Sequence, residues 1–169
     1  LCWEWWTAIL AGRPGRLPGR KSRAGGRQRR PLHPLAPYTA AMSIRHALVT
    51  GANRGLGLEF VRQLLGARSH VVATCRQPGR ATALNVLAGE YPGRLHVLPL
   101  DVAAPKSQAE LARELPLVLG EDGRLDLLVN NAGVLHSGER FGRLEAAGFE
   151  DSFRTNALGP LLLVQALAP

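Results

Sequence analysis

Three glycines follow a short apolar run near residue 50, with a spacing suited to binding phosphate groups. Residues 47–50 are expected to form a buried strand, and a helical pattern begins just after Gly57. Gly51 would allow a sharp turn off the strand, Gly55 would let backbone N–H groups approach a pyrophosphate, and Gly57 would let the helix pack closely. The helix N-terminus would offer unpaired N–H groups and a partial positive charge to the phosphates. This pattern predicts a dinucleotide site, and a P-loop is excluded because no Lys-Ser or Lys-Thr pair follows.

Two cations stand where a dinucleotide domain would contact the adenosine ribose. Arg76 directly follows the apolar run 70–75, and Arg54 lies inside the glycine turn. An acidic residue after this strand would favour NAD, whereas an arginine offers several donors to a 2′-phosphate. The positions of these two arginines therefore favour NADP(H), and the alternative is that both are solvated surface side chains.

A second group of small and amide residues ends another apolar run, at 125–129. It reads Asn130-Asn131-Ala132-Gly133, and its asparagines would tie neighbouring strand ends together while Ala132 and Gly133 leave room for a ribose. Together with Thr50-Gly51-x-x-x-Gly55-x-Gly57, this run resembles the two signatures of the short-chain dehydrogenase/reductase family. The resemblance covers about residues 44–169. It implies an NADP-dependent oxidoreductase that transfers a hydride between NADP(H) and a carbonyl or alcohol substrate.

The resemblance also implies further cofactor contacts. An aspartate and its neighbour after the third strand hold the adenine ring in this family, which here points to Asp101 and Val102. The structural alternative for Asp101 is a turn former or helix cap. Leu56 and Val134 would line the same crevice. The full set of expected cofactor residues is Gly51, Asn53, Arg54, Gly55, Leu56, Gly57, Arg76, Asp101, Val102, Asn130, Asn131, Ala132 and Gly133.

One residue of the family's catalytic tetrad has a match. Asn156, in Thr-Asn-Ala-Leu-Gly, corresponds to the asparagine that holds a water in the proton relay, on a helix that Gly159 and Pro160 would disturb. The tetrad's serine and Tyr-x-x-x-Lys are not found, because Tyr38 and Tyr91 are not followed by lysine four positions later. The chain is thus expected to be the N-terminal half of such an enzyme and to be inactive by itself. The alternative is a non-catalytic, nucleotide-binding truncated isoform that modulates the full-length enzyme.

The run of residues 51–65, with Thr74-Cys75-Arg76, most resembles the sniffer and C-factor type of NADP-dependent carbonyl reductase. Within the domain, alternating strand and helix patterns predict a Rossmann-type, doubly wound α/β fold with strand order 3-2-1-4, truncated after the fourth strand and its following helix. Pro99 places the third strand at an edge. Expected strands cover 47–50, 70–75, 95–100 and 125–129. Expected helices cover about 57–66, 81–89, 106 to before Pro116, and 144–168 with an interruption at Gly159-Pro160.

The formal net charge of +8 is concentrated in a leader, residues 1–41. This leader holds 8 of the 21 basic and 1 of the 13 acidic side chains, all three tryptophans and five of the 12 prolines. It is expected to be disordered, and we favour a non-native extension over a mitochondrial transit segment or a basic binding arm. The domain, residues 42–169, is nearly neutral.

These observations lead to expectations about partners and location. The near-neutral domain argues against a nucleic-acid partner, and no apolar run is long enough to cross a membrane. The two cysteines, Cys2 and Cys75, give no metal-binding spacing, so no metal site is expected. The expected partner is a small carbonyl or alcohol substrate. A homo-oligomer is a possible assembly, because members of the resembling family often pair through the helix that here carries Asn156. The expected location is cytoplasmic, or mitochondrial if the leader is a transit segment.

Overall fold

The computed structural model describes residues 44–120, 124–137 and 140–168. The expected leader, residues 1–41, lies outside these ranges. In the described part, strands and helices alternate along the chain. The elements are β1 (His46–Thr50), α2 (Gly55–Gly66), β2 (His70–Cys75), η1 (Pro78–Arg80), α3 (Thr82–Glu90), β3 (Leu95–Pro99), α4 (Pro105–Leu119), β4 (Leu127–Val129), α5 (Ala146–Phe153), η2 (Arg154–Leu158) and α6 (Gly159–Leu167).

The strands form one parallel sheet in the order β3-β2-β1-β4. This confirms the expected Rossmann-type order and the edge position of β3. β1 and β2 pair in register from His46 with His70 to Thr50 with Thr74, so the glycine turn and Arg76 both follow the same edge of the sheet. Carboxyl ends of parallel strands at one edge are where ligands of open α/β sheets bind.

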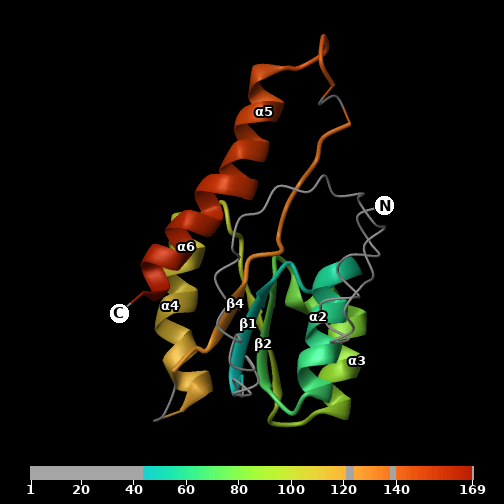
Figure 1. Ribbon diagram of the computed structural model, residues 1–169, viewed down its shortest axis with the longest axis vertical. Coiled ribbons are helices and arrows are strands. Elements are labelled where there is room, and N and C mark those ends of the chain that lie inside the picture. Colours follow the sequence, from blue (N-terminus) through green and yellow to red (C-terminus); the bar gives the residue numbers. More distant parts are fainter. Residues whose placement is uncertain (1–43, 121–123, 138–139, 169) are drawn as a thin grey trace, which may run out of the picture. The chain divides into compact units, whose positions relative to one another are not determined.

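Helices cover both faces of the sheet, as Figure 1 shows with α2 and α3 on one side and α4 and α6 on the other. The first core lies under α2 and α3, where Val61, Leu65 and Leu84 are fully buried against β1 and β2. The second lies under α4 and α6, where Leu111 and Leu163 pack on the opposite face. Parallel strands covered on both faces read as continuous apolar runs, which is why β1 and β2 were easily found in the sequence.

The sequence predicts that helix α4 ends before Pro116, and this prediction is wrong because the helix continues to Leu119. Proline inside a helix removes one hydrogen bond and normally ends or kinks it. Here Pro116 is exposed, so its ring faces solvent, while Leu115 is buried and Val118 and Leu119 pack on the second core. The apolar contacts of the last turn outweigh the lost bond.

Strand β4 is shorter than expected, because it begins at Leu127 and not at residue 125. The Asp126 carboxylate accepts hydrogen bonds from the backbone N–H groups of Arg45 (2.8 Å) and His46 (3.0 Å). These bonds, with smaller contributions from the charges of His46 and Arg124, lower the pKa of Asp126. The Asp126 N–H also donates to the His46 carbonyl at 3.0 Å, so side-chain and backbone hydrogen bonds together hold this residue beside β1 just before β4 begins.

The last helical segment contains the expected disturbance, but upstream of Gly159-Pro160. Residues 154–158 form a π-helical turn between α5 and α6, closed by the bond from the Gly159 N–H to the Arg154 carbonyl. Such wide turns contain one extra residue and are frequent at functional sites. Asn156 lies at the centre of this turn.

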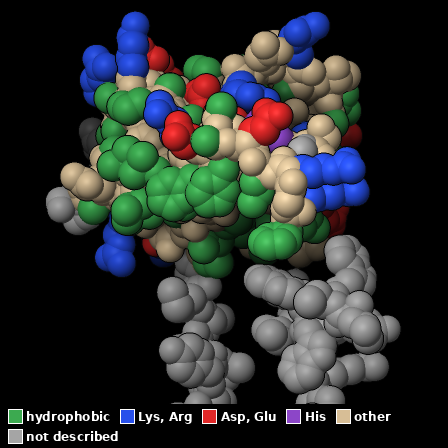
Figure 2. All heavy atoms as spheres, turned by 90° about the horizontal axis from the view of Figure 1, so that it is seen from above, with side chains coloured by type: hydrophobic (Ala, Val, Ile, Leu, Met, Phe, Trp, Pro, Cys, Tyr) green, Lys and Arg blue, Asp and Glu red, His purple; other side chains and the backbone are tan. Residues whose placement is uncertain are grey.

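The surface of the segment after β4 is rich in apolar side chains. Figure 2 shows, from above, hydrophobic side chains gathered across one face with charged groups mostly at its margins. Exposed large apolar residues of this segment include Leu135, Phe141, Leu144, Phe149 and Phe153. None of the helices in the described ranges is long and apolar enough to span a membrane, and these ranges hold no cluster of three potential metal ligands.

Candidate functional site

The turn between β1 and α2 has the backbone geometry that its glycines predict. Gly51 has φ +63°, and a Cβ there would lie 2.7 Å from the Ala132 Cα. A Cβ on Gly57 would lie 2.4 Å from the Gly51 carbonyl oxygen and 2.5 Å from the Asn131 amide nitrogen. Gly55, with φ +58°, has no atom within 4 Å of its Cβ position. Two glycines are thus required by close packing, and the third faces open space.

The N-terminus of α2 is free to bind an anion. The helix begins at Gly55, and no side chain in the described ranges caps it, while Arg54 before it is extended and exposed. The N–H groups of the first turn have no acceptor within their own helix and carry the positive end of the helix dipole. A phosphate at this point would accept several hydrogen bonds at once.

Thr50 and Asn131 form a clasp that joins the ends of β1 and β4. The Thr50 hydroxyl accepts from the N–H groups of Asn131 and Ala132, both at 3.0 Å, and lies 3.4 Å from the Val129 carbonyl. The Asn131 amide donates to the carbonyls of Thr50 (2.9 Å) and Gly51 (3.1 Å). The clasp fixes the glycine turn against the Asn-Asn-Ala-Gly segment, as expected for Asn131. Thr50 had no predicted role, although a threonine at the end of a buried strand is a signal for such contacts.

The expected adenosine end lies beside the ends of β2 and β3. Arg76 is exposed directly after β2, and the bond from the Ala52 N–H to the Thr74 carbonyl (2.9 Å) brings the glycine turn next to that strand end. The neighbouring Cys75 is buried, and burial raises the pKa of its thiol although a backbone hydrogen bond from Gln77 opposes this. Of the two neighbours Cys75 and Arg76, only the arginine is therefore accessible to a ligand.

The turn after β3 is held by hydrogen bonds at Asp101. One carboxylate oxygen of Asp101 accepts from the Ala103 N–H at 2.9 Å, and the Asp101 N–H donates to the Ser107 hydroxyl at 3.0 Å. Asp101 therefore does form this turn, which is the structural role given above as the alternative to adenine binding. The aspartate is exposed, and its second oxygen accepts no hydrogen bond from the residues that the structure describes, while Val102 is buried in the second core.

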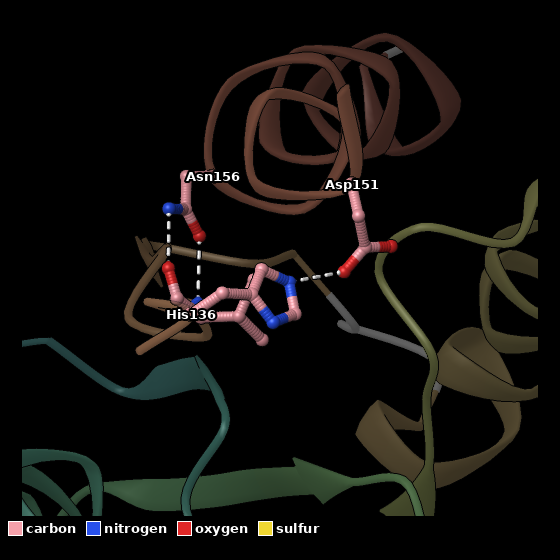
Figure 3. Close-up of polar contacts among 4 residues, drawn as sticks. His136, Asp151 and Asn156 are labelled. Atoms are coloured by element: carbon pink, nitrogen blue, oxygen red, sulfur yellow. Dashed lines mark hydrogen bonds and ion pairs between the residues drawn. The ribbon is translucent and has the colours of Figure 1, made fainter. Parts of the chain in front are cut away.

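Asn156 uses its side chain to hold the segment after β4. Its Oδ1 accepts from the Val134 N–H at 2.8 Å, and its Nδ2 donates to the Val134 carbonyl at 2.7 Å. Figure 3 shows the amide projecting from the helix onto this backbone. A Cβ on Gly133 would lie 3.2 Å from the Asn156 Oδ1, so only glycine fits there without displacement. The part of Asn156 in a proton relay stays a prediction.

A second side-chain pair connects the same two elements. The His136 Nε2 lies 2.8 Å from the Asp151 Oδ2, and both side chains are about half exposed (Figure 3). Asp151 and Asn156 project from one side of the helix although they are five residues apart, which the π turn allows. This pair was not predicted, because a loop histidine 15 residues from its partner leaves no periodic signal in the sequence.

Together these groups form one site at the carboxyl edge of the sheet. The free helix N-terminus, the open side of Gly55 and the exposed Arg54 and Arg76 fit a dinucleotide with an extra phosphate. The Asn156 segment lies beyond β4, at the other end of this edge. The arrangement can thus hold a long anionic cofactor, with adenosine toward β2 and β3 and its reactive ring toward β4.

Comparisons with known proteins agree with this geometry. The family model described as short chain dehydrogenase matches residues 45–169. A WW domain-containing oxidoreductase of Danio rerio is 37% identical over 139 residues, covering 76% of this chain and 32% of that protein. An NADPH-bound carbonyl reductase from chicken fatty liver superposes with a TM-score of 0.67 at 39% identity, covering 73% of this chain and 50% of that chain. A serine dehydrogenase complexed with NADP+ superposes with a TM-score of 0.63 at 31% identity, covering 73% and 48%.

The chain therefore belongs to the short-chain dehydrogenase family, and its fold is that of the N-terminal part of such enzymes. It spans about half the length, or less, of the relatives it matches. The family consists of NAD(P)-dependent oxidoreductases, so the site described above is where their dinucleotide would be held.

Proposed function

We propose that this protein binds NADP(H) and belongs to an oxidoreductase that transfers a hydride between this cofactor and a carbonyl or alcohol. The observation that carries the proposal is a pair of exposed arginines that follow the ends of two adjacent strands. Arg54 follows β1 and Arg76 follows β2. Two relatives of similar structure are described as bound to NADPH and NADP+. The bound cofactor supplies the hydride, and the residues of this chain bind and orient it.

Each part of the site has a separate task in this proposal. The N-terminus of α2 and the backbone around Gly55 hold the pyrophosphate, and Arg76 with Arg54 holds the 2′-phosphate. The free oxygen of Asp101 accepts from the adenine amine. The Thr50–Asn131 clasp keeps the β4 end close to the turn, and Asn156 holds the segment through Val134. For the 169-residue chain by itself we propose binding without turnover, since no Tyr-x-x-x-Lys is found in it to exchange a proton with substrate.

The finer assignment is a carbonyl reductase of the sniffer and C-factor type. It is supported by residues 51–65, by Thr74-Cys75-Arg76, and by 39% identity to a carbonyl reductase. The proposed location is the cytoplasm, and the proposed substrate is a small carbonyl compound or alcohol.

The test is the cofactor preference of an Arg76→Asp variant. A charge-assisted contact with phosphate is worth about 1.5–3 kcal/mol, which is about one to two decades in affinity. The Kd for NADPH, measured by fluorescence titration, should rise by that amount while the Kd for NADH changes little. Arg113→Asp is the matched control, because it makes the same charge change on an exposed face of α4. Equal weakening for both cofactors, or no NADPH binding by the unmodified chain, would refute the proposal.

A further inference from the structure

Gln108 is a buried amide in the first turn of α4, with only 3% of its surface exposed. Its Nε2 donates to two carbonyls, Val102 at 2.7 Å and Gly159 at 3.1 Å. Both amide hydrogens are thus used, and they join residues from the turn after β3 to the start of α6. Burying an amide is unfavourable unless it is paired, so this side chain is placed for those two bonds.

Gly159 brings the two backbones into direct contact. A Cβ at this position would lie 2.4 Å from the Val102 carbonyl oxygen and 3.1 Å from the Arg154 carbonyl oxygen. The Gly159 N–H itself closes the π turn by donating to Arg154. One residue therefore contacts the turn after β3, the Gln108 amide and the far end of the π turn, and a side chain there would separate them.

The two ends of this connection are both parts of the candidate site. At one end, the first turn of α4 fixes the backbone of the turn after β3, through Ser107 at Asp101 and through Gln108 at Val102. At the other end, Asn156 lies three residues before Gly159 within the π turn and holds Val134. Hydrogen bonds of Gln108 join Val102 to Gly159, and the backbone of the π turn continues from Gly159 to Asn156.

We propose that Gln108 is a positioning residue that links the adenine end of the cofactor site to the π turn carrying Asn156. This inference rests on the proposed function, because it assigns the adenine to the turn at Asp101 and Val102. Occupying that turn restrains Val102, the Gln108 amide passes the restraint to Gly159, and the π turn of Asn156 becomes less mobile. The segment that Asn156 holds is thereby set before a substrate arrives.

The chemistry of the amide makes the link testable by substitution. Methionine has nearly the same length but no donor, so Gln108→Met removes both bonds and keeps most of the packing. Gln108→Glu places a carboxylate against two carbonyl oxygens, and only its protonated form can donate to one of them. The second variant is therefore unlinked at high pH and partly linked at low pH.

The experiment is hydrogen exchange on the full 169-residue chain with adenosine 2′,5′-bisphosphate, a probe that has no nicotinamide half. In the unmodified chain, the probe should slow exchange of the amides in residues 154–159 by about fivefold or more, a typical strength for coupled sites. In Gln108→Met the probe should still protect the glycine turn, but protection of 154–159 should be lost. Ser69→Ala is the matched control, since it removes a buried donor to the Ile44 carbonyl at the opposite edge of the sheet.

The outcomes separate this inference from the proposed function. If the probe does not bind the unmodified chain, the proposed function is refuted, and so is the inference that rests on it. Binding without protection of 154–159, or the same protection in Gln108→Met, would overturn the inference alone. If Gln108→Met loses the protection of β1 and β2, and so does not fold, Gln108→Glu decides. In this variant the protection of residues 154–159 by the bound probe, relative to the unmodified chain at the same pH, should fall as the pH rises, and a constant ratio would overturn the link.

Discussion

The clasp between Thr50 and Asn131 leads to the sharpest prediction about stability. Changing Asn131 to aspartate keeps the shape of the side chain but replaces its NH2 group with an oxygen. The two carbonyls that now accept hydrogen bonds at 2.9 Å and 3.1 Å would instead face a carboxylate. Two lost hydrogen bonds are worth about 1 kcal/mol each, and the unpaired acceptors add to this, so the expected loss is about 2–4 kcal/mol.

This loss should be visible in a thermal melt followed by circular dichroism. For a domain of this size, 1 kcal/mol corresponds to a shift of about 4 °C, so the melting temperature should fall by about 8–16 °C. Asn130→Asp is the control, because it is the same change at an exposed neighbour whose side chain makes no hydrogen bond within the described ranges. It should change the stability by no more than about 0.5 kcal/mol. Equal shifts in the two variants would show that Asn131 does not hold the strand ends together.

Three further changes test other parts of the fold. Gly57→Ala should destabilise by about 1–3 kcal/mol in a urea melt, because its Cβ has no room, whereas Gly66→Ala, at the open end of the same helix, should be neutral or stabilising. The lowered pKa of Asp126 means that its contribution to stability is present above the ordinary value of about 3.9 and is lost as the pH falls through the folded-state pKa. Asp126→Asn should therefore lower the melting temperature at pH 7, and the difference from the unmodified chain should shrink as the pH is lowered below the ordinary value. Cys75 should react with iodoacetamide far more slowly in the folded chain than in urea, measured with Cys2 replaced by alanine, and equal rates would contradict its burial and raised pKa.

The parts of the fold that were predicted correctly are those set by local sequence. β2 has the expected limits because a run of small and β-branched residues is bounded by Ser69 and Arg76. The turn after β1 has the backbone geometry that its glycines predict. The order of the strands followed from the alternating pattern and from Pro99. Local signals were sufficient wherever neighbouring residues alone determine the backbone.

The errors arose where a distant contact overrides a local signal. Pro116 predicts a helix end, but the contacts of Val118 and Leu119 with the second core are not visible in sequence. β4 was predicted too long because Asp126 finds its partners at Arg45 and His46, about 80 residues earlier. No local pattern singles out Gln108, since its second acceptor lies 51 residues away.

The π turn also limits how the length of this segment can vary. A π turn contains one residue more than the α-helix that would span the same distance, and each residue of an α-helix adds about 100° of rotation and about 1.5 Å of rise. Deleting Ala157 or Leu158 would therefore allow a regular helix of the same span, so α6 and Leu163 could keep their place on the second core. Asn156 would then lie on a different side of the helix from Asp151, because five α-helical steps of about 100° do not complete whole turns, and its amide would turn away from Val134. A single-codon deletion here is therefore expected to keep the fold but to release the segment after β4, so the extra residue of the π turn serves to direct Asn156 onto Val134.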